Sequence, residues 1–454
     1  MKRSRPLLLL ERTMYREGRT PFTSVFTIQV LGELDEERLR YALARVQAKH
    51  PLLRCVIEEA ASAPRFVLLD RAAAIPLRIV LRRREDDWQT EVRREWVLPF
   101  EASREPLVRF VWLRGGDVNE LVLVAHHCIC DGVSGINLVR ELLSVYDQPE
   151  QDLGSYDTLG AIEDIVPAAV LANRRFQRRV RWKAGILRLM LFLKRRMGSK
   201  PGPRIPAEQV YFHRWNTGTA ASLALTERCR AEGVTVLAAV SVAFMQAFRH
   251  VRGTRGLGKT CTMVDARRFL PGMRADAMFG LAPGIALRTK GLPPPQDMSA
   301  AAFWAQARAV KADLTRRIER LGAGLYETFA GLERLHDRYA GLVAHFESTP
   351  AVRNVTLSNL GKLDLPRDYR NFRVERVYSP LVMVSPTPAN TIVISSFAGD
   401  MEFAIISDEQ SLPQAQALEI QQRAMEILRI CAGLPEQDES APAGEISVMR
   451  AETV

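Results

Sequence analysis

Short apolar segments typical of strands alternate with amphipathic segments typical of helices along the first third of the chain, and this alternation constrains the fold most. Val25–Val30 is rich in strand-forming residues, Asp35 can cap a helix that runs to about Lys49, and Leu52–Ile57 has a strand pattern again. The pattern continues with a strand at Leu77–Leu81, a helix at Glu85–Val97, a hairpin of Leu107–Leu113 and Leu121–Ala125, and a helix at Val133–Tyr146. Such alternation predicts an α/β unit.

The alternation begins again after a proline-rich stretch at Pro201, Pro203 and Pro206. It predicts a helix capped by Thr235 and ending near Val251, a strand at Cys261–Val264, a helix at Phe303–Leu321, a hairpin of Thr391–Phe397 and Met401–Ile406, and a helix at Gln414–Cys431. A chain of 454 residues is also too long for one ordinary core. We therefore predict two α/β subdomains at residues 1–165 and 207–434, a basic crossover segment at 166–206, and a disordered tail at 435–454.

The positive charge is concentrated in one segment. The chain has 63 basic and 52 acidic residues, but twelve of the basic ones lie between Asp164 and Glu208, where no acidic residue occurs. Because the rest is nearly neutral, a general nucleic-acid binder is disfavoured. Six cysteines without a Cys-x-x-Cys pair indicate neither a disulfide framework nor a zinc site, and no apolar run reaches the length of a membrane span. These features predict a cytoplasmic protein.

The sharpest local pattern is His126-His127-Cys128-Ile129-Cys130-Asp131-Gly132, between a predicted strand and a predicted helix. If strand geometry persists through the two histidines, their side chains point to opposite faces, so one serves chemistry and the other packing. An imidazole that titrates near neutrality suits general-base catalysis. Asp131 either orients a histidine or anchors the loop, and Gly132 permits a turn that other residues would resist. His126, His127, Asp131 and Gly132 are therefore the candidate catalytic residues.

This motif resembles that of the thioester-dependent acyltransferase superfamily, which includes chloramphenicol acetyltransferase, stand-alone polyketide and lipid acyltransferases, and the condensation domains of nonribosomal peptide synthetases. Further similar segments are Gly32–Asp35 through Lys49–Arg54 (the first helix and strand), Val264–Arg268 (an arginine-bearing strand) and Leu357–Gly361 (the crossover segment). The resemblance implies an α/β sandwich of two chloramphenicol-acetyltransferase-like subdomains, a pseudo-dimer with a central tunnel. A thioester would enter from one face and the acceptor from the other.

The resemblance also implies roles for single residues. His127 would be the general base, Asp131 would form a structural ion pair with Arg267, and Gly132 would allow a close backbone approach. Ser358 or Asn359 could donate to the developing oxyanion. Neither a metal nor a tightly bound cofactor is expected.

The co-substrate implied is an acyl-CoA, or an acyl-phosphopantetheine thioester on an acyl carrier protein, and the protein is expected to be a monomer. The acceptor would be a hydroxyl of a hydrophobic lipid, polyketide or alcohol, because Asp131-Gly132-Val133-Ser134-Gly135 is closer to the stand-alone ester-forming members. The plant branch is disfavoured because its Asp-Phe-Gly-Trp-Gly signature is absent. Two alternatives remain, an amide-forming stand-alone condensation enzyme and a non-catalytic homologue that binds a carrier or a membrane.

Two other patterns have competing interpretations. Gly253–Thr260 matches a phosphate-loop pattern, but it lies between a predicted helix and a predicted strand, the reverse of the order that a phosphate loop requires. A helix-to-strand turn is the better interpretation. His126, Cys128, Cys130 and Asp131 could be drawn as a metal site, but no second group of ligands follows elsewhere. We expect the two cysteines to be packing groups.

The basic segment also carries an apolar stripe at spacings of three and four residues, formed by Trp182, Ile186, Leu189, Leu193 and Met197. In one interpretation this stripe packs on the body of the protein and the charges face water. In the other, residues 173–204 attract an acidic partner, which could be an anionic membrane surface, an acyl carrier protein or the phosphates of coenzyme A. If the acidic partner is a membrane, the protein would lie at the inner face of that membrane. Both interpretations of the stripe remain open.

Overall fold

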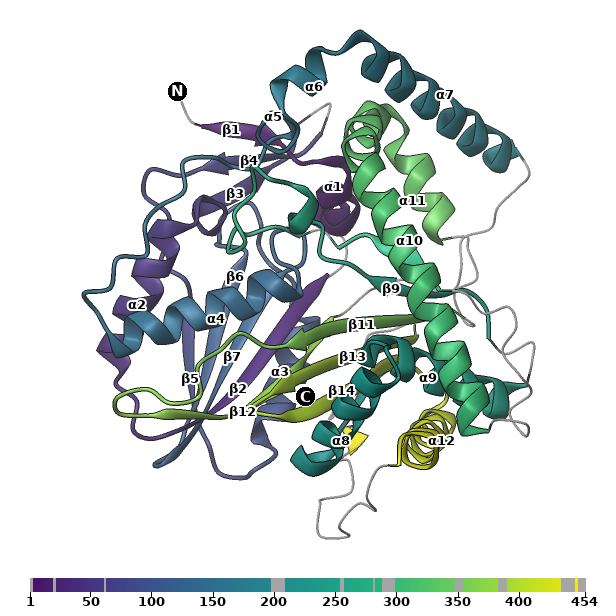
Figure 1. Cartoon of the computed structure of the whole chain (residues 1–454). Helices are drawn as coiled ribbons and strands as arrows, with labels where there is room; N and C mark the ends of the chain where they lie inside the picture. Colours follow the sequence, from purple (N-terminus) through teal and green to yellow (C-terminus); the bar gives the residue numbers. More distant parts are fainter. Residues whose placement is uncertain are drawn as a thin grey trace.

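Two large sheets and one small sheet form the framework of the protein (Figure 1). The computed structural model describes residues 3–18, 22–60, 63–196, 209–253, 257–280, 282–287, 299–347, 354–382, 390–433 and 446–447. The predicted mixed α/β class with two subdomains is confirmed. The segment boundaries predicted at 165, 206 and 434 stay predictions, and Met197, the proline-rich stretch and most of the tail lie outside the described residues.

The first large sheet has five strands in the order β12-β2-β7-β6-β5. Their bounds are β2 Thr23–Leu31, β5 Leu77–Leu81, β6 Val108–Arg114, β7 Val118–His126 and β12 Arg373–Val382. Side chains alternate between the two faces: Phe26 belongs to the core under α2 (Glu36–Lys49) and α4 (Gly132–Asp147). Its neighbour Val25 belongs to the cluster that contains α3 (Asp87–Val97).

The second large sheet has seven strands in the order β10-β9-β11-β13-β14-β8-β15. Their bounds are β8 Val210–Asn216, β9 Thr260–Met263, β10 Gly284–Ala286, β11 Val355–Lys362, β13 Asn390–Phe397, β14 Asp400–Asp408 and β15 Ile446–Ser447. One apolar core joins this sheet to α8 Gly218–Ala231, α9 Val236–Arg252, α10 Ala300–Leu332 and α12 Gln414–Ala432. On its other face, Phe212, Val393 and Ala404 share a buried cluster with Trp96 and Val111, so the two sheets share a core that α3 also enters. The sheets also contact each other directly, since the hydroxyls of Ser379 in β12 and Ser395 in β13 lie 2.9 Å apart.

Strand β12 comes from the second half of the chain but pairs with β2 of the first sheet, with Arg373 opposite Leu31. The chain reaches β12 from β11, which contains the predicted crossover segment Leu357–Gly361. A bulge between Asn359 and Gly361 interrupts the pairing of β11 with β13, and Gly361 has a positive φ of 67° that favours glycine.

The remaining elements complete the outside of the molecule. They are β1 Ser4–Pro6, β3 Cys55–Glu58, β4 Arg65–Leu68, α1 Leu9–Tyr15, α5 Ile162–Ile165, α6 Ala168–Ala172, α7 Arg174–Arg196 and α11 Tyr339–Glu347, with short 3-10 turns between them. The strand predicted from Leu52 begins only at Cys55, because Pro51 opens a 3-10 turn. The helix predicted to end at Leu321 continues to Leu332.

None of the described helices is by itself both long and apolar enough to cross a membrane. Helices α8 and α9 meet that test only jointly, as a pair bent by 105°.

Candidate active site

The loop that carries the His-His-x-x-x-Asp-Gly motif joins the end of β7 to the start of α4. The backbone N–H of His127 donates to the carbonyl of Phe22 at 2.7 Å, and that of His126 donates to the carbonyl of Leu107 at 2.9 Å. Asp131 is the N-cap of α4, where its side chain accepts from the backbone N–H of Ser134 at 2.8 Å. The loop is therefore held at both ends.

His127 is the partly exposed histidine of the pair. Its Nδ1 lies 2.7 Å from the carbonyl oxygen of Cys130. Because a carbonyl oxygen can only accept, Nδ1 carries the proton, and Nε2 keeps a lone pair that no described residue engages. Burial lowers the pKa of His127, an effect that the bond to Cys130 and the charge of Asp131 oppose without reversing. The ring is therefore a neutral base at neutral pH.

His126 lies in different surroundings. It is buried, with the rings of Tyr15 and Phe100 at centroid distances of 6.1 and 5.9 Å. Its Nδ1 accepts from the backbone N–H of Cys128 at 3.2 Å. Burial, together with the charges of His127 and Arg109, lowers the pKa of His126 to about 3. This ring is thus a neutral packing group that also fixes the loop.

Asp131 and Arg267 form a buried, two-pronged ion pair. The two guanidinium nitrogens of Arg267 donate to the two carboxylate oxygens of Asp131 at 2.8 and 3.0 Å. Arg267 also donates to the hydroxyl of Ser134 at 2.6 Å. Since Arg267 follows β9 of the second sheet and Asp131 begins α4, the pair ties the two halves of the chain together next to the motif.

Two reasons for a glycine at position 132 were predicted, a turn that other residues would resist and a close approach to the backbone. The φ of Gly132 is not in the left-handed region, so the expectation of a turn that only glycine tolerates is wrong. A Cβ at this position would instead lie 2.4 Å from Cδ2 of Leu360, in strand β11. Gly132 therefore makes room for β11 to approach the start of α4.

The same strand carries the two predicted oxyanion donors. Ser358 and Asn359 precede Leu360, and both side chains are partly exposed. Oδ1 of Asn359 accepts from the backbone N–H of Gly361 at 2.9 Å, inside the bulge of β11. The contact of Leu360 with Gly132 thus brings this part of β11 to the motif loop.

Phe279 and Gly280 are two residues of the site that the sequence did not reveal. The carbonyl of Phe279 accepts from the backbone N–H of Asp131 at 3.1 Å, and its N–H donates to the hydroxyl of Ser134 at 3.1 Å. A Cβ on Gly280 would lie 2.3 Å from the backbone oxygen of His127. No motif marks these positions, because the contact joins segments far apart in the sequence.

We expect the substitution Gly280→Ala to destabilise the fold by about 1–3 kcal/mol and to lower activity, because backbone at His127 must move to admit the methyl group. Chemical unfolding and turnover measure the two effects. Gly116→Ala is the matched control, since nothing lies within 4 Å of a Cβ there. Equal stability and turnover of the two variants would show that the contact at Gly280 is unimportant.

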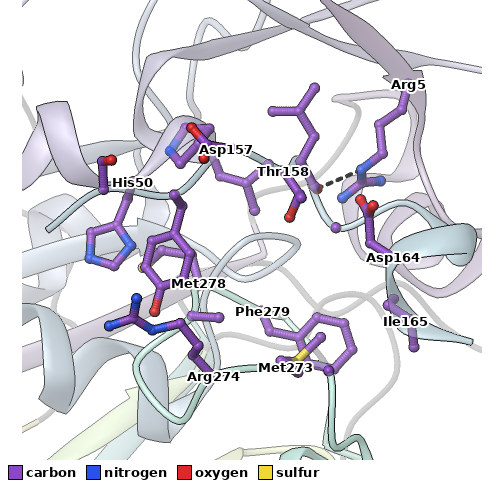
Figure 2. A pocket seen from close by; sticks show the side chains of 18 of the residues that line it. Arg5, His50, Asp157, Thr158, Asp164, Ile165, Met273, Arg274, Met278 and Phe279 are labelled. Atoms are coloured by element: carbon purple, nitrogen blue, oxygen red, sulfur yellow. Dashed lines mark hydrogen bonds between the residues drawn. The ribbon is translucent and has the colours of Figure 1, made fainter. Parts of the chain in front are cut away.

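A cavity of about 290 Å³ is lined in part by Phe279. Figure 2 shows Met273, Met278 and Phe279 along one side and Asp157 and Thr158 across from them. His127 is not among its lining residues. The predicted tunnel stays a prediction, because residues 19–21, which precede Phe22, and residue 281, which follows Gly280, lie outside the described residues.

A second charged cluster holds the loop before Phe279 against the first half of the chain. Nζ of Lys49 donates to Glu141 and to Asp276, both at 2.6 Å, and His50 contacts Glu141 at 2.7 Å. Burial would raise the pKa of Asp276, but the bonds from Lys49 and Tyr156 outweigh it and hold that pKa well below its usual range. The loop is therefore anchored at Asp276 as well as at Phe279.

The competing patterns can be placed on the structure. Burial raises the pKa of Cys128 and of Cys130 well above that of a free thiol, so both are neutral packing groups. Among the described residues, no group of three or more His, Cys, Asp or Glu side chains could hold a metal ion. The phosphate-loop pattern stands between α9 and β9, the helix-to-strand order that we predicted, although residues 254–256 lie outside the description.

Comparison with known proteins agrees with the resemblance drawn from the motif. Residues 13–154 match the family model of the condensation domain. Surfactin synthase subunit 2 of Bacillus subtilis is 34% identical over 116 residues, which are 25% of this chain and 3% of that protein. The curated relatives are far longer than the region that they share with this chain, which spans 1% to 5% of their length.

Solved structures show that the fold extends over nearly the whole chain. The trichothecene 15-O-acetyltransferase of Fusarium sporotrichioides aligns with a TM-score of 0.70 at 13% identity, over 96% of each chain. The first condensation domain of the calcium-dependent antibiotic synthetase aligns with a TM-score of 0.67 at 16% identity, over 95% of this chain and 97% of that one. The expected condensation-domain and chloramphenicol-acetyltransferase-like fold is therefore confirmed.

Proposed function

We propose that this protein is an acyltransferase that moves an acyl group from a CoA or acyl-carrier-protein thioester to a hydroxyl group of a hydrophobic lipid, polyketide or alcohol. The observation that carries the proposal is the state of His127. Its Nδ1 proton is bonded to the Cys130 carbonyl, its Nε2 lone pair has no partner among the described residues, and the residue is partly exposed at the end of β7. The match to the condensation-domain family and the likeness to a structure named as an O-acetyltransferase support this chemistry.

In the proposed reaction, Nε2 of His127 takes the proton of the acceptor hydroxyl as the oxygen attacks the thioester carbonyl carbon. The carbon–sulfur bond then breaks, and the thiolate leaves with the proton from the imidazolium. Ser358 or Asn359 would donate to the oxyanion in between. Asp131 and Arg267 would act by holding the loop, so they are positioning residues. No covalent acyl-enzyme, metal or tightly bound cofactor is needed.

A second candidate function is amide formation with an amine acceptor. Amide formation is favoured by the match to the condensation-domain family model and by the 34% sequence identity to a surfactin synthase subunit. The two candidates use the same base and the same thioester, and they differ only in the atom that attacks.

Thiol release from a panel of acyl-CoA and acyl-carrier-protein thioesters tests the proposal, with a hydrophobic alcohol and a matched amine offered side by side. Mass spectrometry of the acylated products identifies the acceptor. We expect release that depends on the alcohol and yields an ester. Amide as the main product would favour the second candidate, and binding of thioesters without any acceptor-dependent release would overturn both in favour of a non-catalytic binder.

We also propose a cytoplasmic monomer that associates with the inner face of the membrane. The exposed outer face of α7 would make the contact with the membrane.

A further inference from the structure

Helix α7 has two apolar faces, and only one of them packs on the protein. Phe176, Val180, Ala184 and Leu191 are buried, in clusters with residues of α10, α11 and the turn between them. Figure 1 shows α7 along an outer edge of the molecule, beside α10 and α11. The helix is therefore already anchored without the stripe that the sequence singled out.

The stripe identified in the sequence is the exposed face. Trp182, Ile186, Leu189 and Leu193 are 68%, 41%, 58% and 50% exposed. With 3.6 residues per turn, these positions lie on the side of the helix away from the buried residues. The interpretation in which this stripe packs on the body is therefore wrong. A row of large apolar side chains in water favours an interaction surface.

Cations without a described ion-pair partner precede and flank the apolar row. With 3.6 residues per turn, Arg175 and Arg178 lie on the same side of the helix as the row, and Arg174 and Arg181 lie at its edge. Arg174, Arg175, Arg178 and Arg181 are exposed, and no ion pair with a described residue engages them. Three further cations of the helix behave differently: Arg179 and Lys183 both pair with Glu327, and Arg188 pairs with Asp337 at 3.0 Å. One set of cations thus secures α7 to the protein, and the other set is directed to solvent.

We propose that the outer face of α7 docks the protein on a lipid surface that carries anionic headgroups. The four arginines would contact the headgroups, and Trp182, Ile186, Leu189 and Leu193 would enter the boundary with the acyl chains. Tryptophan is favoured at that boundary, because its ring is apolar and its N–H can bond to water. The proposal does not depend on the acyl-transfer chemistry.

A second copy of the chain fits this face less well. If two α7 helices met in parallel, the four arginines of each copy would face those of the other. If they met antiparallel, the arginines would be buried against the apolar row without an acidic partner. An anionic lipid surface satisfies both halves of the face at once. The face contains no acidic residue, since none lies between Asp164 and Glu208.

Trp182 makes the proposal directly measurable. The chain has six tryptophans, and the other five are at most 5% exposed. Acrylamide in water should therefore quench mainly Trp182 in the full-length protein. We expect vesicles of phosphatidylcholine mixed with phosphatidylglycerol to bind the protein and to protect Trp182 from the quencher. Vesicles of phosphatidylcholine alone should bind far more weakly, and added salt should weaken binding to the mixed vesicles.

Variants separate the cationic half of the face from the apolar half. Each basic residue near an anionic surface strengthens binding by about five-fold, so R174Q/R175Q/R178Q should lower vesicle affinity by about 10²-fold. The matched control R83Q/R84Q/R104Q removes three exposed arginines elsewhere and should change affinity little. W182S/L189S should lower affinity by about ten-fold or more, whereas L81S/L223S removes two other exposed leucines and should not.

Several results would overturn the proposal. They are equal loss of affinity in the α7 variants and their controls, equal binding to both kinds of vesicle, or continued quenching of Trp182 on bound protein. Protection of Trp182 that rises with protein concentration in the absence of lipid would show that a second copy covers the face instead. Sedimentation of the free protein checks that outcome.

Discussion

Replacing His127 by alanine is expected to lower acyl-transfer turnover by about 10²- to 10⁴-fold, the usual contribution of a general base. The fold should survive the change. His127 is partly exposed, and the hydrogen bond of its ring to the Cys130 carbonyl contributes about 1 kcal/mol of stability. Thiol release measures turnover, and circular dichroism with a thermal melt measures the fold.

Two comparisons make this result specific to His127. His250→Ala removes an exposed histidine at the end of α9 and should leave turnover unchanged. The pH profile of the wild type gives the second comparison. The acid limb of the kcat/KM profile reports the pKa of the catalytic base in the free enzyme. Because burial lowers the pKa of His127, the pKa read from this limb should lie below the ordinary histidine value of about 6.5. Unchanged turnover in His127→Ala would refute the assignment of the base.

Local patterns in the sequence predicted the elements that present the motif. Asp35 and Thr235 cap the helices that they were expected to cap, each by accepting from the backbone N–H three residues later. The strand pattern before His126 and the helical pattern after Gly132 placed the motif at a strand end. These signals succeed because capping and periodicity depend on neighbours within one or two turns.

Contacts between distant segments could not be predicted in the same way. Nothing in Arg373–Val382 indicates that it pairs with β2 of the other half, because strand partners are chosen by tertiary packing. Gly280 resembles any loop glycine until the backbone of His127 is found against it. In α7, two apolar stripes satisfy the helical period equally well, so periodicity alone could not decide which of them packs.

The pairing of Asp131 with Arg267 came from the family resemblance and not from the residues themselves. The structure adds the charged and polar groups that surround this ion pair. Burial opposes the charge on Arg267, but Asp131 and Asp265 more than offset this and raise the pKa of the guanidinium. Ser134 completes the arrangement, since its hydroxyl contacts Arg267, Asp131 and the N–H of Phe279. The ion pair, the N-cap of α4 and the loop of Phe279 therefore form one connected unit.

We expect the substitution Arg267→Met to lower the free energy of unfolding by about 3–5 kcal/mol, because it leaves the carboxylate of Asp131 buried without its partner. Chemical denaturation, followed by tryptophan fluorescence, measures the loss. Arg423→Met is the matched control. This substitution removes the ion pair of Arg423 with Glu426, in which both side chains are 44% exposed. It should lower the free energy of unfolding by only about 0–1 kcal/mol.

The double variant Asp131→Asn with Arg267→Met separates charge from position. Asparagine can still accept the N–H of Ser134 as an N-cap, but it carries no charge, so much of the stability lost in Arg267→Met should return. If Asp131 acts only by positioning the loop, turnover should return together with stability. Restored stability without turnover would instead show that the carboxylate takes part in the reaction. A loss in Arg267→Met no larger than in Arg423→Met would show that the ion pair does not hold the two halves together.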